Sequence, residues 1–291
     1  MKKQYKFGHT SVALLLPDEM MIPENMGLFE CQGEEVQKVC ELQLVDDLER
    51  IIQSFLTENP NVQMIARNNM KIFRLQDKEC RILHFEGETV PYAFFVEESN
   101  EYSKTYVSDH VREMLKYDAV FGSLLGLEKI MIESDAMILH SAYMCREGKA
   151  ILFSAPSETG KSTQANLWGK YRGTRTINGD RSLLIREEDG WYAYGWPICG
   201  SSEICHNESY PIQAIVMLHQ AKENRIHKLS LLESVKKLIS QITINMWNSK
   251  FQMRALDQIQ KLAVEIPVYE LGCDISEEAV KCLENILEEN A

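Results

Sequence analysis

The sequence Phe153-Ser154-Ala155-Pro156-Ser157-Glu158-Thr159-Gly160-Lys161-Ser162-Thr163 lies between an apolar run, 150–153, and a segment compatible with a helix, 164–168. The alanine, glycine, lysine and serine at positions 155, 160, 161 and 162 have the spacing of a phosphate-binding loop, with alanine in place of the usual first glycine. Such a loop binds polyphosphate through its backbone N–H groups and the positive end of the following helix. We therefore expect the nine residues from Ala155 to Thr163 to bind a nucleotide; the alternative is a Gly-Lys-Ser turn with no ligand.

Two side chains of this loop have expected roles of their own. Lys161 would reach the β- and γ-phosphates of ATP as a charge-assisted hydrogen-bond donor. The hydroxyl group of Ser162 would be a ligand of Mg²⁺, a cation that prefers oxygen donors. The loop thus predicts ATP and Mg²⁺ as the groups bound.

The composition limits the class of protein. The chain has 291 residues and a net charge of −12, with 45% hydrophobic and 25% charged residues, which is ordinary for a globular protein of one large or two smaller domains. The negative charge argues against a nucleic-acid partner. No apolar run approaches the roughly 20 residues that span a bilayer, and the run 12–16 is too short for a signal peptide. We therefore expect a cytoplasmic protein with no membrane partner, and its eight scattered cysteines fit a reducing compartment.

The part of the chain before the loop is expected to be rich in β-strands. Residues 1–110 contain short apolar or alternating runs separated by polar turns, and one helical pattern, 47–56. A broad apolar stripe over 109–129 predicts one helix, and we take 111–130 as a helix that connects two domains. The loop would then belong to a second domain, 131–291.

Alternating β and α patterns continue through this second domain. Two hairpins are expected, 136–143 with 149–153 and 182–186 with 191–194, because each pair surrounds a turn with a glycine. The run 212–218 is nearly all apolar and predicts a buried strand. Helical patterns follow at 230–246 and 253–262, and a strand at 266–271 precedes a last amphipathic helix. The chain is therefore expected to have an α/β fold with a mixed β-sheet.

Four segments carry a resemblance to a known family. They are Leu139-His140-Ser141, Ser157–Thr163, Asn178-Gly179-Asp180-Arg181 and Val268-Tyr269-Glu270-Leu271. In this order they resemble HPr kinase/phosphorylase and the nucleotide-binding part of phosphoenolpyruvate carboxykinases, over roughly residues 130–290. The last segment looks like the closing strand of HPr kinase-like proteins from peptide-modification clusters. The resemblance implies an HPr kinase C-terminal-like phosphate-loop domain, preceded here by a β-rich domain that resembles nothing we can name.

The chain departs from the pattern of this family at two positions. The family usually has two adjacent acids after the loop, and Gly179 stands at the first of them. It usually has glycine where Glu158 stands, so a carboxylate lies near the phosphates and a residue with a side chain occupies a position where glycine tolerates positive φ. Both departures bear on transfer chemistry more than on nucleotide binding.

The resemblance also implies the remaining site residues. Asp180 falls on the second acid of the family, where it would bind Mg²⁺ or accept the proton of the phosphoryl acceptor; the alternative is a plain turn residue. His140 would face the γ-phosphate, and the alternative is a histidine satisfied in the core. Arg181 would pair with phosphate, but alternation along a strand would point it to the opposite face. The expected catalytic residues are Asp180, Lys161 and His140, and the expected metal ligands are Ser162 and Asp180.

These inferences converge on an ATP-dependent kinase, a phosphotransferase that moves the γ-phosphate to a hydroxyl group. The acceptor would be a serine of a peptide or protein, or a small molecule. An alternative function is a nucleotide-binding regulator with reduced transfer activity, which Gly179 and Glu158 motivate. The sequence leaves the acceptor, the preferred base and any oligomer open.

Overall fold

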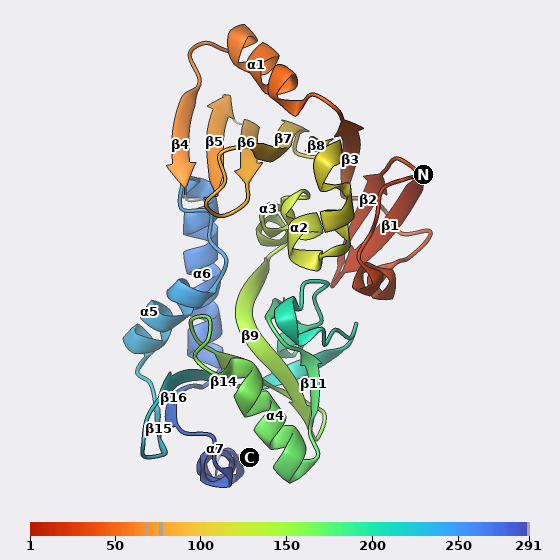
Figure 1. Cartoon of the computed structure of the whole chain (residues 1–291). Coiled ribbons are helices and arrows are strands. Elements are labelled where there is room, and N and C mark those ends of the chain that lie inside the picture. Colours follow the sequence, from red (N-terminus) through yellow and green to blue (C-terminus); the bar gives the residue numbers. More distant parts are fainter. Residues whose placement is uncertain (68, 76–77, 290–291) are drawn as a thin grey trace. The chain divides into compact units, whose positions relative to one another are not determined.

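The structure, a computed structural model, describes residues 1–67, 69–75 and 78–289 (Figure 1). The chain divides into two compact units, Met1–Leu127 and Glu128–Ala291. Each unit has a sheet of its own, and both units combine strands with helices. The expected α/β class with mixed sheets is therefore confirmed.

The first unit is built around one mixed sheet with the strand order β1-β2-β3-β8-β7-β6-β5-β4. β2, β3 and β8 run parallel to one another, and the other neighbours are antiparallel. Its elements are β1 (Lys2–Phe7), β2 (Thr10–Leu15), a 3₁₀ helix (Glu24–Phe29), β3 (Lys38–Val45), α1 (Leu48–Glu58), β4 (Gln63–Arg67), β5 (Met70–Leu75), β6 (Lys78–His84), β7 (Pro91–Ser99), β8 (Tyr102–Ser108), a second 3₁₀ helix (Asp109–Lys116), α2 (Asp118–Ser123) and α3 (Leu127–Glu133), which continues into the second unit.

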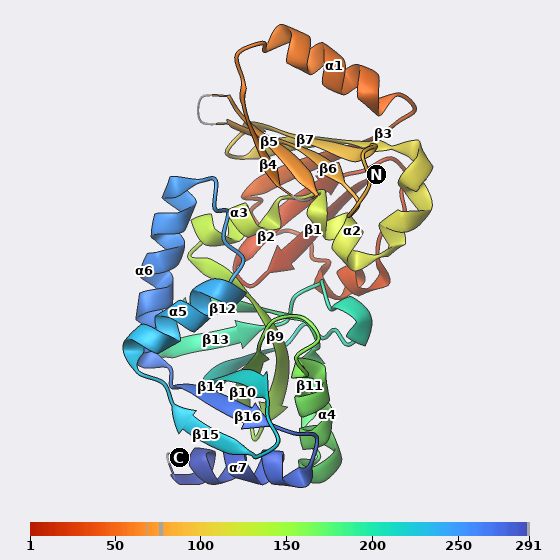
Figure 2. The same cartoon turned by 60° about the vertical axis from the view of Figure 1, so that its left-hand side comes forward.

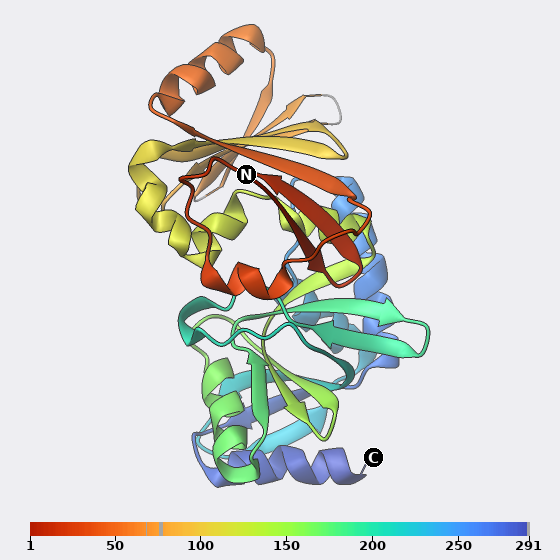
Figure 3. The ribbon, with the colours of Figure 1, turned by 90° about the vertical axis from the view of Figure 1, so that its right-hand side faces the viewer.

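Helix α1 forms where the sequence predicts it and covers one part of this sheet (Figure 3). The side chain of Asp47 caps the helix by accepting a hydrogen bond from the backbone N–H of Arg50 at 2.9 Å. Leu48 and Ile52 then pack with apolar side chains of the strands, including Phe94. The apolar stripe of the helix is thus buried against the sheet, as its spacing requires.

The single helix expected over 109–129 is wrong. The segment forms the 3₁₀ helix Asp109–Lys116, then α2, then α3. Tyr117 interrupts it with extended backbone at φ −83° and ψ 127°, and Gly126 interrupts it again at φ +58°. The apolar stripe is real, since Leu115, Phe121 and Leu124 are buried, but three short pieces present it. The spacing of apolar residues predicts which side chains are buried, but it does not predict where the helical backbone is interrupted.

The second unit contains the phosphate-binding motif. Its elements are β9 (Ala136–Arg146), β10 (Lys149–Ser154), α4 (Lys161–Arg172), β11 (Arg175–Asn178), β12 (Arg181–Glu187), β13 (Gly190–Tyr194), a 3₁₀ helix (Gly200–Ser202), β14 (Ser209–Gln220), β15 (Arg225–Lys228), α5 (Leu231–Gln241), α6 (Ser249–Glu265), β16 (Val268–Cys273) and α7 (Glu277–Glu289). Both expected hairpins form, β9 with β10 and β12 with β13, and the buried strand is β14. The helix expected over 230–246 ends earlier, at Gln241.

The sheet of this unit closes on itself through two long strands (Figure 2). β9 pairs with β12 along residues 136–140 and with β10 along residues 141–146. β14 pairs with β13 along 209–211 and runs parallel to β10 along 212–217, so β10 lies between β9 and β14. The carboxyl ends of β10, β14 and β16 therefore meet at the same edge, because these three strands are parallel.

Strand β10 is buried on both faces, which explains its continuous apolar sequence. Ile151 and Phe153 contribute to the core under α4 and α7, together with Trp168. Ala150 and Leu152 contribute to the opposite core, under α5 and α6. Packing on both sides fixes the end of β10, and with it the start of the phosphate-binding loop.

Two further findings concern membrane-spanning helices and disulfide bonds. Within the described ranges, no helix is long and apolar enough to cross a membrane. None of the eight cysteines, all of which lie in those ranges, forms a disulfide.

Candidate functional site

The loop between β10 and α4 has the backbone that its sequence predicts. Gly160 adopts φ +116° immediately before the first residue of α4, a conformation that favours glycine. Glu158 also has a positive φ, +63°, although it carries a side chain. The loop thus turns through two residues with left-handed backbone, and α4 begins directly after the second of them.

Lys161 is folded back over this loop. Its ammonium group donates to the carbonyl oxygens of Ala155 at 3.1 Å and Pro156 at 3.3 Å, and only 7% of the residue is exposed. Burial lowers the pKa of Lys161, while the charge of Asp180 acts in the opposite direction. A desolvated cation held by two neutral oxygens is a favourable partner for an anion that enters the cavity.

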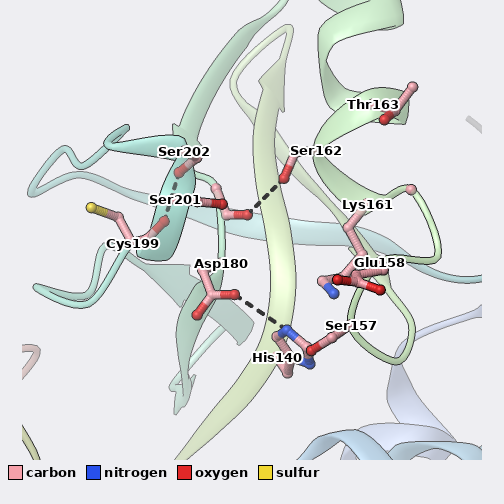
Figure 4. Close-up of a pocket in the computed structure, with 12 residues that line it drawn as sticks. His140, Ser157, Glu158, Lys161, Ser162, Thr163, Asp180, Cys199, Ser201 and Ser202 are labelled. Atoms are coloured by element: carbon pink, nitrogen blue, oxygen red, sulfur yellow. Dashed lines mark hydrogen bonds and ion pairs between the residues drawn. The ribbon is translucent and has the colours of Figure 1, made fainter. Parts of the chain in front are cut away.

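Asp180 lies across the cavity from the loop, in the turn before β12 (Figure 4). Its Oδ1 atom lies 3.2 Å from Nε2 of His140, which stands on β9 opposite the start of β12. The Ser162 hydroxyl donates to the carbonyl oxygen of Gly179 at 3.2 Å. The structure therefore places all three predicted catalytic residues, Asp180, Lys161 and His140, around one cavity.

The carboxyl group of Asp180 is held in its ionised form. Burial acts to raise its pKa, but the hydrogen bond from His140 and the nearby charges of Arg181, His140 and Lys161 outweigh that effect, so the pKa is lowered. Arg181 contributes through Nε, 3.3 Å from Oδ2 of Asp180. Arg181 does not line the cavity, in agreement with the expectation that it would not face the phosphates, but it reaches Asp180 because that residue stands in the turn and not in the strand.

Asn178 organises this turn. Its Oδ1 atom accepts hydrogen bonds from the backbone N–H groups of Asp180 and Arg181, both at 2.9 Å. Its Nδ2 group donates to the carbonyl oxygens of Trp196 at 2.6 Å and Ile198 at 3.2 Å. This fully buried amide joins the turn to the segment 196–198 and so fixes the position of the Asp180 carboxylate. Asparagine side chains commonly bind the backbone two residues further on, so the Asn-Gly pair at 178–179 is a sequence signal for this turn.

Gly179, the residue before Asp180, is closely covered. A Cβ atom at this position would lie 2.0 Å from Oγ of Ser202. Ser202 itself is fixed, because Oγ donates to the carbonyl oxygen of Cys199 at 2.6 Å and accepts from the N–H of Ile204 at 3.3 Å. The backbone of Gly179 is not left-handed. Packing of the 199–202 segment, and not conformation, excludes a side chain here.

The cavity has a volume of about 330 Å³ and opens between the loop and the turn (Figure 4). Ala155 and Pro156 contribute carbonyl oxygens to Lys161 without lining the cavity. The segment 195–202 is rich in small residues, a composition that permits close approach to a ligand, and its residues 199, 201 and 202 line the cavity. The residues that line the cavity are His140, Ser157, Glu158, Gly160, Lys161, Ser162, Thr163, Gly179, Asp180, Cys199, Ser201 and Ser202.

The residues of this cavity suit Mg²⁺ bound together with phosphate. Mg²⁺ commonly takes one or two carboxylates, keeps several waters and shares phosphate oxygens. The ionised Asp180 and the Ser162 hydroxyl would be its protein ligands. No group of three or more His, Cys, Asp or Glu residues that could hold a metal alone occurs among the residues described. The donor set therefore fits a magnesium–nucleotide complex better than a metal held by protein alone.

Glu158 provides a first test of the loop. Glu158→Gly is expected to stabilise the protein by about 1 kcal/mol, because relief of a left-handed residue exceeds the added freedom of glycine in the unfolded chain. It is also expected to tighten ATP binding, because a negative charge leaves the rim of the cavity. Thermal unfolding and calorimetry at two salt concentrations measure the two effects.

Two variants separate strain from charge. Glu158→Gln removes the charge and keeps the left-handed side chain, so it should tighten binding without the gain in stability. Glu147→Gly relieves a similar conformation, φ +52°, in the turn between β9 and β10, and should stabilise without changing binding. Weaker ATP binding by Glu158→Gly at both salt concentrations would contradict the expectation.

Comparison with known proteins gives a family for the chain. Residues 110–288, more than half of the chain, match the family model described as SynChlorMet cassette protein ScmC. No curated protein matches the chain in sequence. Among solved structures, the Hpr(Ser) kinase/phosphatase from Coxiella burnetii is 10% identical, with 53% of this chain and 93% of that chain covered and a TM-score of 0.32, which is too low to indicate a shared fold. The chain belongs to the ScmC family.

Proposed function

We propose that this ScmC-family protein binds the magnesium complex of ATP and transfers the γ-phosphate to a hydroxyl group. The observation that carries the proposal is the convergence of Lys161, Ser162 and the Asp180–His140 pair on one cavity at the end of β10. These side chains come from three separate segments of the second unit. Phosphoryl transfer requires mainly such positioning and charge neutralisation around the γ-phosphate.

The roles follow from the geometry of each group. The backbone N–H groups of the loop and Lys161 would bind the phosphates, and Lys161 would exchange its two carbonyl partners for phosphate oxygens. Mg²⁺, when bound, would neutralise charge on the phosphates. Asp180 and His140 would orient the hydroxyl group of the acceptor on the opposite side.

The reaction balances with the groups present. The acceptor oxygen forms a bond to the γ-phosphorus, the bond from that phosphorus to the β–γ bridging oxygen breaks, and ADP leaves. The hydroxyl proton passes to the Asp180 carboxylate, which His140 orients. A carboxylate with a lowered pKa is a weak base, but a loose transition state places little demand on the base.

Incubation with γ-labelled ATP, Mg²⁺ and a lysate of the host tests the proposal. We expect label in a product that survives removal of free nucleotide, and the mass of that product separates a peptide or protein from a small molecule. The absence of both bound ATP and labelled product would overturn the proposal. Bound ATP with no product would favour the second candidate below.

The second candidate is a nucleotide-binding regulator with reduced transfer activity. The observation in its favour is the packing of Ser202 against Gly179, which leaves one acid at positions 179 and 180 where the resembled family has two. A regulator needs nucleotide binding and a response to it, but no aligned acceptor. The two functions differ in turnover.

Gly179→Asp measures how firmly the 199–202 segment excludes a second acid. We expect the single variant to lower the free energy of unfolding by about 1–3 kcal/mol, because Ser202 must move and lose its two hydrogen bonds. Ser202→Gly opens the space but also removes these two hydrogen bonds, so the double variant should be more stable than the sum of the two single effects predicts. Denaturant unfolding of the four proteins in this cycle gives the coupling free energy.

The same four proteins distinguish the two candidate functions. In the kinase, the parent protein turns over and the double variant changes its rate. In the regulator, the parent shows no turnover, and a gain appears only when the second acid is restored. Additive stability effects of the two substitutions would show that Ser202 does not fill the space of a side chain at 179.

A further inference from the structure

A second cavity lies beside the phosphate-binding loop in the same unit. Its volume is about 410 Å³, within the usual range for small-molecule sites. Loop residues 158–160 and the first turn of α4 form one wall. The other wall comes from the ends of two parallel strands, with Gln220 and Ala221 at the end of β14 and Cys273, Asp274 and Ile275 at the end of β16. In open parallel sheets, ligands bind at the carboxyl ends of strands.

The two cavities lie on opposite sides of β10. His140 stands on β9 and Asp180 directly before β12, whereas Gln220 and Cys273, which line the second cavity, stand at the ends of β14 and β16 on the other side of β10. Glu158, Gly160 and Thr163 line both cavities, so the loop connects them. A triphosphate whose last phosphate lies beside Lys161 and Asp180 would extend along the loop and bring the rest of its molecule into the second cavity.

The rim of this cavity presents an exposed apolar side chain on a hydrogen-bonded turn. Ile275 is 77% exposed and lines the cavity. A single exposed isoleucine is ordinary on a protein surface. This one stands between Asp274 and Ser276, and Oδ1 of Asp274 accepts from Asn224 at 3.0 Å and from the N–H of Ser276 at 2.9 Å. The turn that carries Ile275 is therefore organised before any ligand binds.

Gln164 ties this turn to the phosphate-binding helix. Its Nε2 group donates to the carbonyl oxygen of Asp274 at 3.0 Å and to Sγ of Cys273 at 3.2 Å, and only 2% of the residue is exposed. The distance between the phosphate loop and the Ile275 turn is thus set by a buried amide. A rigid spacing of this kind suits a ligand that contacts both ends.

We propose that the second cavity binds the nucleoside part of the nucleoside triphosphate, with the base packed on Ile275 and near Ala221. The proposal rests on the proposed nucleotide-binding function and adds the place of the nucleoside, so that the ligand is bound through both of its ends. The exposed amide of Gln220 offers a donor and an acceptor to the edge of the base. The phosphoryl acceptor fits this cavity less well, because Asp180 and His140 do not line it.

Comparison of ATP with inorganic tripolyphosphate tests this inference, because both carry the phosphates and only ATP carries a nucleoside. Binding of each, with Mg²⁺, is measured by calorimetry for the parent protein, Ile275→Ser and Lys161→Met. We expect Ile275→Ser to weaken ATP binding about tenfold, through lost apolar contact, and to leave tripolyphosphate binding unchanged. Lys161→Met should weaken both ligands.

An exposed apolar side chain far from the phosphate-binding loop in the sequence, Met253, provides the control. Met253→Ser removes a similarly exposed apolar side chain from α6, 73% exposed, and should change neither affinity. Equal affinity of the parent for ATP and tripolyphosphate, or an Ile275→Ser variant that binds ATP like the parent or loses both ligands equally, would overturn the nucleoside cavity and leave the phosphate site standing. Binding of neither ligand by the parent would overturn the proposed function and this inference together.

Discussion

Lys161→Met is expected to weaken binding of the ATP–magnesium complex by about 10- to 150-fold and to abolish phosphoryl transfer. A charged hydrogen bond contributes about 1.5–3 kcal/mol, and the variant removes the charged donor. The fold should survive with a change in the free energy of unfolding within about 1 kcal/mol. Methionine keeps most of the volume and removes a desolvated charge, which offsets the loss of the hydrogen bonds to the carbonyl oxygens of Ala155 and Pro156.

Weaker ATP binding at a nearly unchanged free energy of unfolding would identify Lys161 as a ligand-binding residue. If Lys161 served only the structure, its substitution would lower the free energy of unfolding and the affinity for ATP together. Lys170→Met is the matched control, because Lys170 stands on the same helix, is exposed and lies 4.7 Å from the ring of Tyr171. Calorimetry and thermal unfolding of both variants check the expectation. An unchanged affinity for ATP in Lys161→Met would show that the loop does not bind the phosphates.

The local parts of this site could be predicted because each is encoded by neighbouring residues. The turn at Gly160 needs a left-handed residue, the helix begins at the lysine that follows, and the preceding apolar run is buried on both faces. The hairpins were predictable for the same reason, since each turn contains a glycine between two patterned strands. The structure also shows a positive φ at Glu158, a position at which a conformation open to glycine was expected.

The parts that could not be predicted depend on residues far apart in the sequence. Gly179 marks a missing acid, but nothing in the sequence says that Ser202 fills its space. The guanidinium group of Arg181 reaches Asp180 because the carboxylate stands in a turn, which a simple alternation rule does not include. The prediction of one helix over 109–129 was wrong at Tyr117, where the backbone is extended although no glycine or proline stands there.

Asp180→Asn distinguishes the kinase from the regulator most directly. Asparagine keeps the size of the side chain and an oxygen that can accept from His140, but it removes the carboxylate charge that Arg181 and Lys161 face. ATP should still bind through the loop. If Asp180 orients or deprotonates the acceptor, transfer should fall by about 10²- to 10⁴-fold, the usual contribution of a general base. Asp189→Asn, in the exposed turn between β12 and β13, should keep the parental rate.

The magnesium dependence of the same variant separates the two roles of Asp180. If the carboxylate is mainly a metal ligand, the concentration of Mg²⁺ that gives half of the maximal rate should rise as the rate falls, and added Mg²⁺ should recover part of the rate. If it acts on the acceptor, the rate should fall at every Mg²⁺ concentration with an unchanged half-maximal value. In a regulator, the substitution would alter nucleotide binding with no turnover to lose. An Asp180→Asn protein with the parental rate and the parental Mg²⁺ requirement would remove Asp180 from the chemistry, and His140, which lines the same cavity beside Asp180, would then be the residue to test as the base.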